Sequence, residues 1–244
     1  MRTRTAKTPK SPSGVKRAKP AAEAQVALAL TPKGEAVRER ILTVALEAFA
    51  RNGFKNATTR EIADAAGVNL PALQYYFGGK EDLYRACAES VVDRYRAQTD
   101  AIAEQALAVL ASRPSAQAAR VQLKALMHAL AILLTGSKEA PTWAMFVARQ
   151  MNETSKGLEI LQKQLWSPGI DLVAQLISVA GDYDAASARI RAIWLISNAT
   201  MFQPGRPILL QLAGWRQIGG GELKVLLAMI DRQIDEIGAG SKLK

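Results

Sequence analysis

The sequence predicts an all-α fold with an N-terminal three-helix helix-turn-helix domain, a long connecting helix and a C-terminal helical bundle. Apolar residues recur at helical spacing, cap signals and a glycine punctuate residues 58–77, and no strand pattern competes. We therefore expect four parts. They are a disordered basic tail (1–33), the helix-turn-helix domain (34–95), a helical domain (96–238) and a flexible C-terminus (239–244).

The composition of the 244-residue chain limits its class. Hydrophobic residues make up 49%, which is enough for packed cores, and no apolar run approaches the roughly 20 uncharged residues of a membrane span. No signal peptide is visible, so we expect a cytoplasmic protein that does not cross a membrane. The single cysteine and single histidine argue against a disulfide framework and a metal cluster, and we expect no cofactor.

The net charge of +10 is unevenly distributed. Residues 1–33 carry +7, residues 34–95 carry −1 and residues 96–244 carry +4. Nucleic-acid affinity of the helix-turn-helix domain must therefore depend on where a few cations and helix ends are placed. The tail is either a basic arm that adds phosphate or minor-groove contacts, or a solubilising segment.

The helix-turn-helix begins after a bracing helix expected from Glu35 to Arg51, which Asn52-Gly53 should end. Thr58 and Glu61 have the spacing of a capping box, which predicts that a helix begins there. Its inner stripe is Ile62, Ala63 and Ala66. The alanines leave room for a second helix to cross closely.

The second helix is expected from Leu70 to about Phe77, after a turn at Gly67 and a cap at Asn69, with Pro71 in its first turn. Leu73 and Phe77 point inward. Its outer face suits a major groove, because glutamine pairs bidentately with adenine, alanine contacts a thymine methyl and tyrosine hydroxyls can reach phosphates. Before the long helix from Glu81 to about Val109, the free amides and the Lys80 ammonium should form a phosphate-binding corner. The candidate DNA-binding residues are Thr58, Thr59, Arg60, Asn69, Leu70, Pro71, Ala72, Gln74, Tyr75, Tyr76 and Lys80.

Residues 34–95 resemble the DNA-binding domain of TetR-type transcriptional regulators. The matching positions are Thr58, Ile62, Ala63, Ala66, Gly67, Val68, Tyr75, Phe77, Gly78, Lys80, Glu81, Leu83 and Tyr84. The family often has Ser and Gly where Asn69 and Pro71 stand, and a His-Tyr or Tyr-His pair where Tyr75-Tyr76 stand. The operator sequence of relatives therefore does not transfer to this chain.

The remaining sequence reads as a bundle of helices. We expect helices at 115–135, from Pro141 to about 152, at 157–166 with a stop at Ser167-Pro168-Gly169, at 170–179, from about 185 to near Pro204, at 208–215 and at 223–237, with Gly219-Gly220-Gly221 as a flexible turn. Residues 146–153 and 202–215 resemble the CecR-type C-terminal domain of TetR-like regulators.

An enzyme is not expected, because the one histidine, His128, lies in a very apolar helix and no phosphate-binding loop is present. A ligand pocket is the better use of the bundle, although each aromatic residue also fits an ordinary core. The candidate ligand-binding residues are His128, Trp143, Phe146, Arg149, Gln150, Trp166, Trp194, Asn198 and Phe202.

The hypothesis that follows is a homodimer that represses transcription at a palindromic double-stranded DNA operator and is released by a small-molecule effector. One helix-turn-helix reads too few bases, and the resemblance implies pairing of residues 190–202 and 223–237 with their copies. Two alternatives stay open: a helical ligand-binding protein without operator function, and a basic protein that binds DNA without sequence preference.

Overall fold

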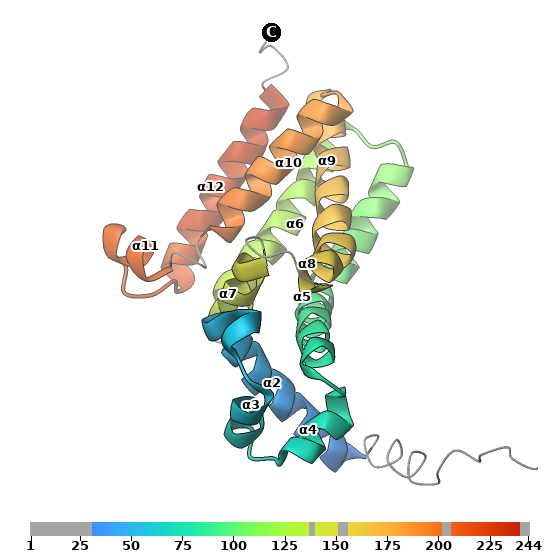
Figure 1. Cartoon of the computed structure of the whole chain (residues 1–244). Coiled ribbons are helices and arrows are strands. Elements are labelled where there is room, and N and C mark those ends of the chain that lie inside the picture. The colour runs from blue at the N-terminus through green and yellow to red at the C-terminus, as the bar shows by residue number, and fades with distance from the viewer. Residues whose placement is uncertain (1–30, 137–139, 151–155, 202–205, 240–244) are drawn as a thin grey trace, which may run out of the picture. The chain divides into compact units, whose positions relative to one another are not determined.

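The computed structural model describes residues 31–136, 140–150, 156–201 and 206–239, which form helices joined by short loops and contain no β-strand (Figure 1). The predicted tail up to residue 30 and the last five residues lie outside these ranges. The contacts of the chain fall into two units, residues 1–39 and 40–244. In the first unit, the described residues are Thr31 and the opening turns of helix α2, where the Thr31 hydroxyl accepts a hydrogen bond from the Gly34 amide at 3.1 Å.

Helix α2 runs from Pro32 to Asn56 and is interrupted at Gly53, whose backbone angles are φ 76° and ψ 171°. These angles are not helical, so the predicted break at Asn52-Gly53 is confirmed. Glycine suits the position because a positive φ of this kind strains residues with a Cβ. Helical structure then resumes for the last residues up to Asn56. Ile41, Ala45 and Phe49 on the inner face are completely buried.

Three helices follow the bracing helix: α3 at Thr59–Ala65, α4 at Leu70–Phe77 and α5 at Lys80–Ala111. The predicted second helix of the pair is confirmed at both ends. The inner face of α5 buries Leu83, Tyr84 and Val91, and buries Cys87 completely. Burial raises the pKa of the Cys87 thiol, so it remains protonated and behaves as a small hydrophobic residue.

The second half of the chain is a bundle around α6. Its elements are α6 at Ala116–Gly136, α7 at Ala140–Gln150, α8 at Lys156–Leu161, the π-helix η1 at Gln162–Trp166, α9 at Ser167–Gly181, α10 at Ala185–Thr200, α11 at Arg206–Leu212 and α12 at Gly220–Ala239. Leu123 and Met127 of α6 share one hydrophobic core with Leu176 of α9, Leu195 of α10 and Ile234 of α12. In Figure 1, α6 lies among α9, α10 and α12.

Two predicted breaks in this bundle are wrong. Ser167-Pro168-Gly169 does not stop the helix, because Trp166 stays helical (φ −71°, ψ −50°) and Pro168 lies in the first turn of α9. The π turn before it widens the helix, which relieves the clash of the proline ring with the preceding turn. The three glycines at 219–221 are not simply a turn, since α12 begins at Gly220 and the Glu222 carboxylate accepts the Gly219 amide at 3.0 Å.

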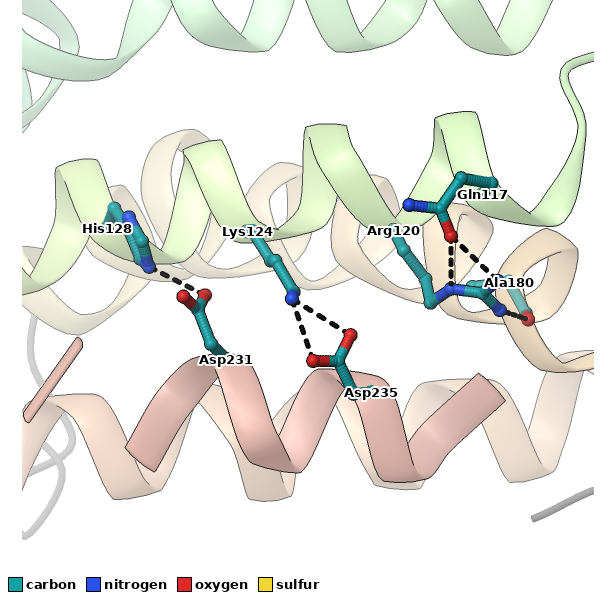
Figure 2. Close-up of polar contacts among 7 residues, drawn as sticks. All are labelled: Gln117, Arg120, Lys124, His128, Ala180, Asp231 and Asp235. Carbon is teal, nitrogen blue, oxygen red and sulfur yellow. Dashed lines mark hydrogen bonds and ion pairs between the residues drawn. The ribbon is translucent and has the colours of Figure 1, made fainter. Parts of the chain in front are cut away.

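Helix α6 is long and apolar enough to span a membrane by length and composition, with 21 residues and a mean hydropathy of 1.3. Much of its apolar surface, including Leu123, Leu126 and Met127, is nevertheless buried in the bundle core, whereas Val121 and Ile132 are exposed. Its polar face contacts neighbouring helices: Lys124 pairs with Asp235 of α12 at 2.8 Å, and Arg120 donates to the Ala180 carbonyl of α9 at 3.1 Å (Figure 2). These contacts fix α6 as the central helix of the bundle.

Candidate DNA-binding surface and effector pocket

The ends of the recognition pair are held by local caps. The Thr58 hydroxyl accepts the Glu61 amide at 3.2 Å, and the Glu61 carboxylate accepts the Thr58 amide at 3.2 Å. The Asn69 side chain accepts the Ala72 amide at 2.8 Å, and Gly67 between the helices has φ 64°. The predicted caps are therefore confirmed, and these two side chains have a structural task at the helix ends.

Arg40 adds a long-range contact that sequence reasoning missed. Its Nε donates to the carbonyl of Ala66 at 2.8 Å, at the C-terminal end of α3. A cation at a helix C-terminus is stabilised by the carbonyl dipoles there. Arg40 thus ties the bracing helix to α3, and only the fold reveals this contact, since 26 residues separate the two partners.

None of the predicted DNA-contact residues is buried in the fold. Thr58, Arg60, Asn69, Pro71 and Gln74 are exposed, whereas Thr59, Leu70, Ala72, Tyr75, Tyr76 and Lys80 are half-buried. The buried residues of α4 are Leu73 and Phe77, as predicted. Gln74 is therefore the exposed amide side chain of α4, with the donor and acceptor groups that suit an adenine edge.

The tyrosine pair corrects one expectation. The Tyr75 hydroxyl is inaccessible to solvent and has no hydrogen-bond partner among the described residues. In this conformation the hydroxyl is therefore not available to a phosphate, and the Tyr75 ring meets the Tyr76 ring edge-on, with centroids 5.0 Å apart. The buried, unsatisfied hydroxyl favours a different side-chain position when a polar partner is present.

Lys80 has intramolecular partners that sequence reasoning missed. Its ammonium donates to the Lys55 carbonyl at 3.2 Å and lies 4.7 Å from the centre of the Phe54 ring. One of the three ammonium N–H groups is therefore engaged with the end of α2, where helix carbonyls attract the charge, and the phosphate contact of Lys80 stays a prediction. The first turn of α5 instead carries the acidic Glu81 and Asp82.

Thr58→Ala is expected to lower the free energy of unfolding by about 1 kcal/mol, because the substitution removes the acceptor of the capping box. Urea unfolding monitored by circular dichroism measures this. Thr59→Ala is the control, since it removes a hydroxyl one residue later and leaves the cap intact. Equal unfolding midpoints for the two variants would contradict the prediction.

A small pocket of about 60 Å³ lies between α6, α10 and α12. Its lining residues are Ala131, Thr135, Asn198, Ala199, Leu226, Met229, Ile230 and Gln233. No charged side chain is among them. The pocket therefore offers an apolar space with a hydroxyl and two amides, which suits a small uncharged group.

Of the predicted ligand-binding residues that the structure describes, only Asn198 lines this pocket. His128 is paired with Asp231 of α12, with Nε2 and Oδ1 2.8 Å apart (Figure 2). Trp194 is 69% exposed and Trp166 is half-buried, and Phe202 lies outside the described residues. The sequence-based prediction grouped these residues by side-chain type, whereas the fold places them in different parts of the protein.

The four predicted ligand residues of α7 lie elsewhere, at its contacts with α2 and α5. Trp143, Phe146 and Gln150 are buried. The Arg94 guanidinium of α5 lies 5.2 Å from the centre of the Trp143 ring, and the Phe146 ring packs on Tyr84 of α5. The Arg149 side chain donates to backbone carbonyls of α2. These residues join the bundle to the helix-turn-helix domain.

Comparison with known proteins matches both halves of the chain. The family model for bacterial regulatory proteins of the tetR family matches residues 41–87, and that for the C-terminal domain of the HTH-type transcriptional dual regulator CecR matches residues 119–241. The HTH-type transcriptional dual regulator CecR of Shigella flexneri is 31% identical over 215 residues, which cover 87% of this chain and 96% of that protein.

Solved structures share the fold. A TetR-like transcriptional regulator from Rhodococcus sp. RHA1 has a TM-score of 0.57 at 20% identity, covering 84% of this chain and 97% of that chain. AibR, in complex with isovaleryl coenzyme A and operator DNA, has a TM-score of 0.55 at 14% identity, covering 79% of this chain and 97% of that chain.

A helix-turn-helix pair joined to a helical bundle of this kind defines a DNA-binding transcriptional regulator. The chain belongs to the TetR family of transcriptional regulators, and its bundle is a CecR-type C-terminal domain.

Proposed function

We propose that this regulator is a cytoplasmic homodimer without enzymatic activity that represses transcription from a palindromic operator and is released by a small uncharged effector. The observation that carries the proposal is the arrangement of α10 and α12. Both helices expose large apolar side chains beside the pocket that they form with α6. A pocket at this place can couple ligand binding to the geometry of the pair of subunits.

The exposed apolar residues supply the dimer part of the proposal. On α10 these are Ile190, Ile193 and Trp194, and on α12 they are Val225 and Met229, each between 46% and 69% exposed. Within each helix the later residues lie three or four positions after the first and so share one face with it, and exposed apolar faces of this kind mark interaction surfaces in soluble proteins. Two copies related by a two-fold axis would bury these faces together and present two recognition helices to one side of the DNA.

The pocket supplies the effector part. Thr135, Asn198 and Gln233 are its polar lining residues, and the rest are apolar. Burial of an uncharged ligand beside these groups satisfies their hydrogen bonds, whereas a charged ligand would lose its hydration without a partner. The proposed ligand is therefore a small neutral molecule. The isovaleryl coenzyme A of AibR carries phosphates, for which the described lining has no cation.

Selection from random duplexes tests the proposal. We expect a palindromic site bound at least about a thousandfold more tightly than scrambled DNA. A neutral effector from a metabolite panel should then raise the melting temperature and lower operator affinity. Uniform, strongly salt-dependent binding of all duplexes would contradict the operator, and a panel that changes neither quantity would contradict effector release.

Gln74→Ala is expected to weaken binding to the selected operator by about 1–3 kcal/mol and to relax base preference at one position in each half-site. The reason is that Gln74 is the exposed amide of the recognition helix. Fluorescence anisotropy with operators altered one base at a time measures both effects. Gln162→Ala, an exposed glutamine of the bundle, should bind like the unchanged protein, and equal affinities for the two variants would exclude Gln74 from base reading.

A further inference from the structure

Helix α7 contacts the helix-turn-helix domain through a cluster of aromatic rings. The Phe146 ring lies 5.3 Å from the Tyr84 ring of α5, and Tyr84 in turn packs against Phe49 at 4.8 Å and Phe54 at 4.9 Å, all measured between ring centroids. Phe146 and Phe49 are completely buried. Aromatic packing of this kind makes α7 continuous with the core formed by α2 and α5.

Two hydrogen bonds from the end of α7 to α2 accompany this aromatic packing. The Arg149 Nε donates to the Ala50 carbonyl at 3.2 Å, and an Nη donates to the Arg51 carbonyl at 2.9 Å. Both carbonyls stand at the end of the helical stretch that Gly53 interrupts. A guanidinium that spans two adjacent carbonyls at a helix C-terminus makes charge-assisted bonds and fixes the orientation of that end.

The next residue holds the other helix. Gln150 is completely buried, and its amide nitrogen donates to the Tyr84 hydroxyl of α5 at 2.5 Å and to the Phe146 carbonyl at 3.3 Å. Consecutive residues of α7 therefore hold α2 and α5, the two helices that flank the recognition pair in the sequence. A buried amide that lost its partner would carry a desolvation penalty, so the Gln150 contact resists small shifts.

Gly157 of α8 closes the joint from the bundle side. A Cβ at this position would lie 2.8 Å from the Gln150 Oε1 and 3.1 Å from the Tyr84 Cε1. No methyl group fits there without displacing the Gln150–Tyr84 pair. The backbone of α8 therefore packs closely against the contact that joins α7 to α5, so a movement of α8 would disturb that contact.

We infer that Arg149 and Gln150 are positioning residues that set the separation of the two recognition helices, and that α8 acts on them through Gly157. The inference rests on the proposed dimeric reading of two half-sites. A rigid joint between each bundle and its helix-turn-helix domain is what limits the protein to one half-site separation. Loosening the joint should widen the range of separations without changing the bases that each recognition helix reads.

The test uses the full-length chain and duplexes that carry the selected half-sites at a series of separations. Arg149→Gln and Gln150→Leu should bind the preferred separation at least about tenfold more weakly, because each substitution removes buried or charge-assisted hydrogen bonds, and both should discriminate less among separations. Arg149→Lys, which keeps the charge without the guanidinium fork, should recover part of the preference. Gly157→Ala should broaden the preference although it removes no polar group.

The matched control is Arg120→Gln, which removes another arginine that donates to a backbone carbonyl, that of Ala180 within the bundle. This variant should keep the sharp preference. The inference would be overturned if the original protein prefers one half-site separation and Arg149→Gln and Gly157→Ala keep the same narrow preference. The proposed function would not be affected by that result.

Amide hydrogen exchange of the free protein provides a readout that does not need an operator. Arg149→Gln should accelerate exchange at residues 50–56 by about tenfold, whereas Arg120→Gln should not. If the original protein selects no operator, the proposed function fails. The exchange experiment still tests whether Arg149 holds the end of α2. Equal exchange at residues 50–56 in both variants would show that Arg149 does not hold the end of α2.

Discussion

Trp194→Glu combined with Val225→Glu is expected to yield a folded monomer whose operator affinity is at least about a thousandfold lower, near that for scrambled DNA. The two side chains are 69% and 50% exposed on α10 and α12. Their replacement should change the stability of the single chain little, because exposed substitutions cost about 0.5 kcal/mol or less. In a dimer, however, four carboxylates would be buried near one another without partners.

Light scattering and operator titration together measure this result. Val121→Glu is the matched control, because Val121 is 52% exposed on α6, outside the α10–α12 face. That variant should remain dimeric and bind the operator normally. A double variant that stays dimeric would place the subunit contact elsewhere, and a monomer with full operator affinity would show that one helix-turn-helix is sufficient.

The recognition pair could be predicted closely because its signals are local. The cap at Thr58 is decided within three residues, and the same is true of Asn69 and Ala72. Helix α4 therefore has the predicted bounds, Leu70–Phe77. A cap needs only its own helix end, so propensity and spacing suffice where tertiary contacts do not intervene.

The roles of several site residues could not be predicted because their partners are distant in the sequence. The Lys80 ammonium bonds to a carbonyl 25 residues earlier, and Arg149 bonds to a carbonyl 98 residues earlier. Aromatic and amide residues of α7 have the composition of a pocket wall, yet they form a joint. Residue type indicates what a side chain can bind, and the packing of helices determines which partner it meets.

A helix break predicted within the bundle was also wrong. Pro168 carries a strong stop signal, but the π turn at Gln162–Trp166 lets the chain remain helical from α8 into α9. A π turn has no reliable sequence pattern of its own. The consequence is a continuous path of helical structure from Gly157, at the joint, to Gly181, at the contact with α12.

Gly181→Ala is expected to destabilise the protein by about 1–3 kcal/mol, the usual cost of forcing an extra carbon into a packed interior. The added Cβ would lie 2.3 Å from the Tyr183 ring and 2.6 Å from the Ile237 carbonyl of α12. The second contact is the more severe one, because a backbone oxygen cannot rotate away. Moreover, the Tyr183 hydroxyl donates to that same carbonyl at 3.1 Å, so the ring and α12 are displaced together.

Gly169→Ala is the matched control, since it places the same methyl group on the same helix where no heavy atom lies within 4 Å. It should leave stability unchanged or raise it by about 0.5–1 kcal/mol, because alanine is the better helix former. Thermal unfolding of both variants measures the difference. Since α12 also carries half of the proposed subunit contact, Gly181→Ala should weaken operator binding as well. Loss of stability with full operator affinity would show that the added methyl group displaces α12 without altering the dimer.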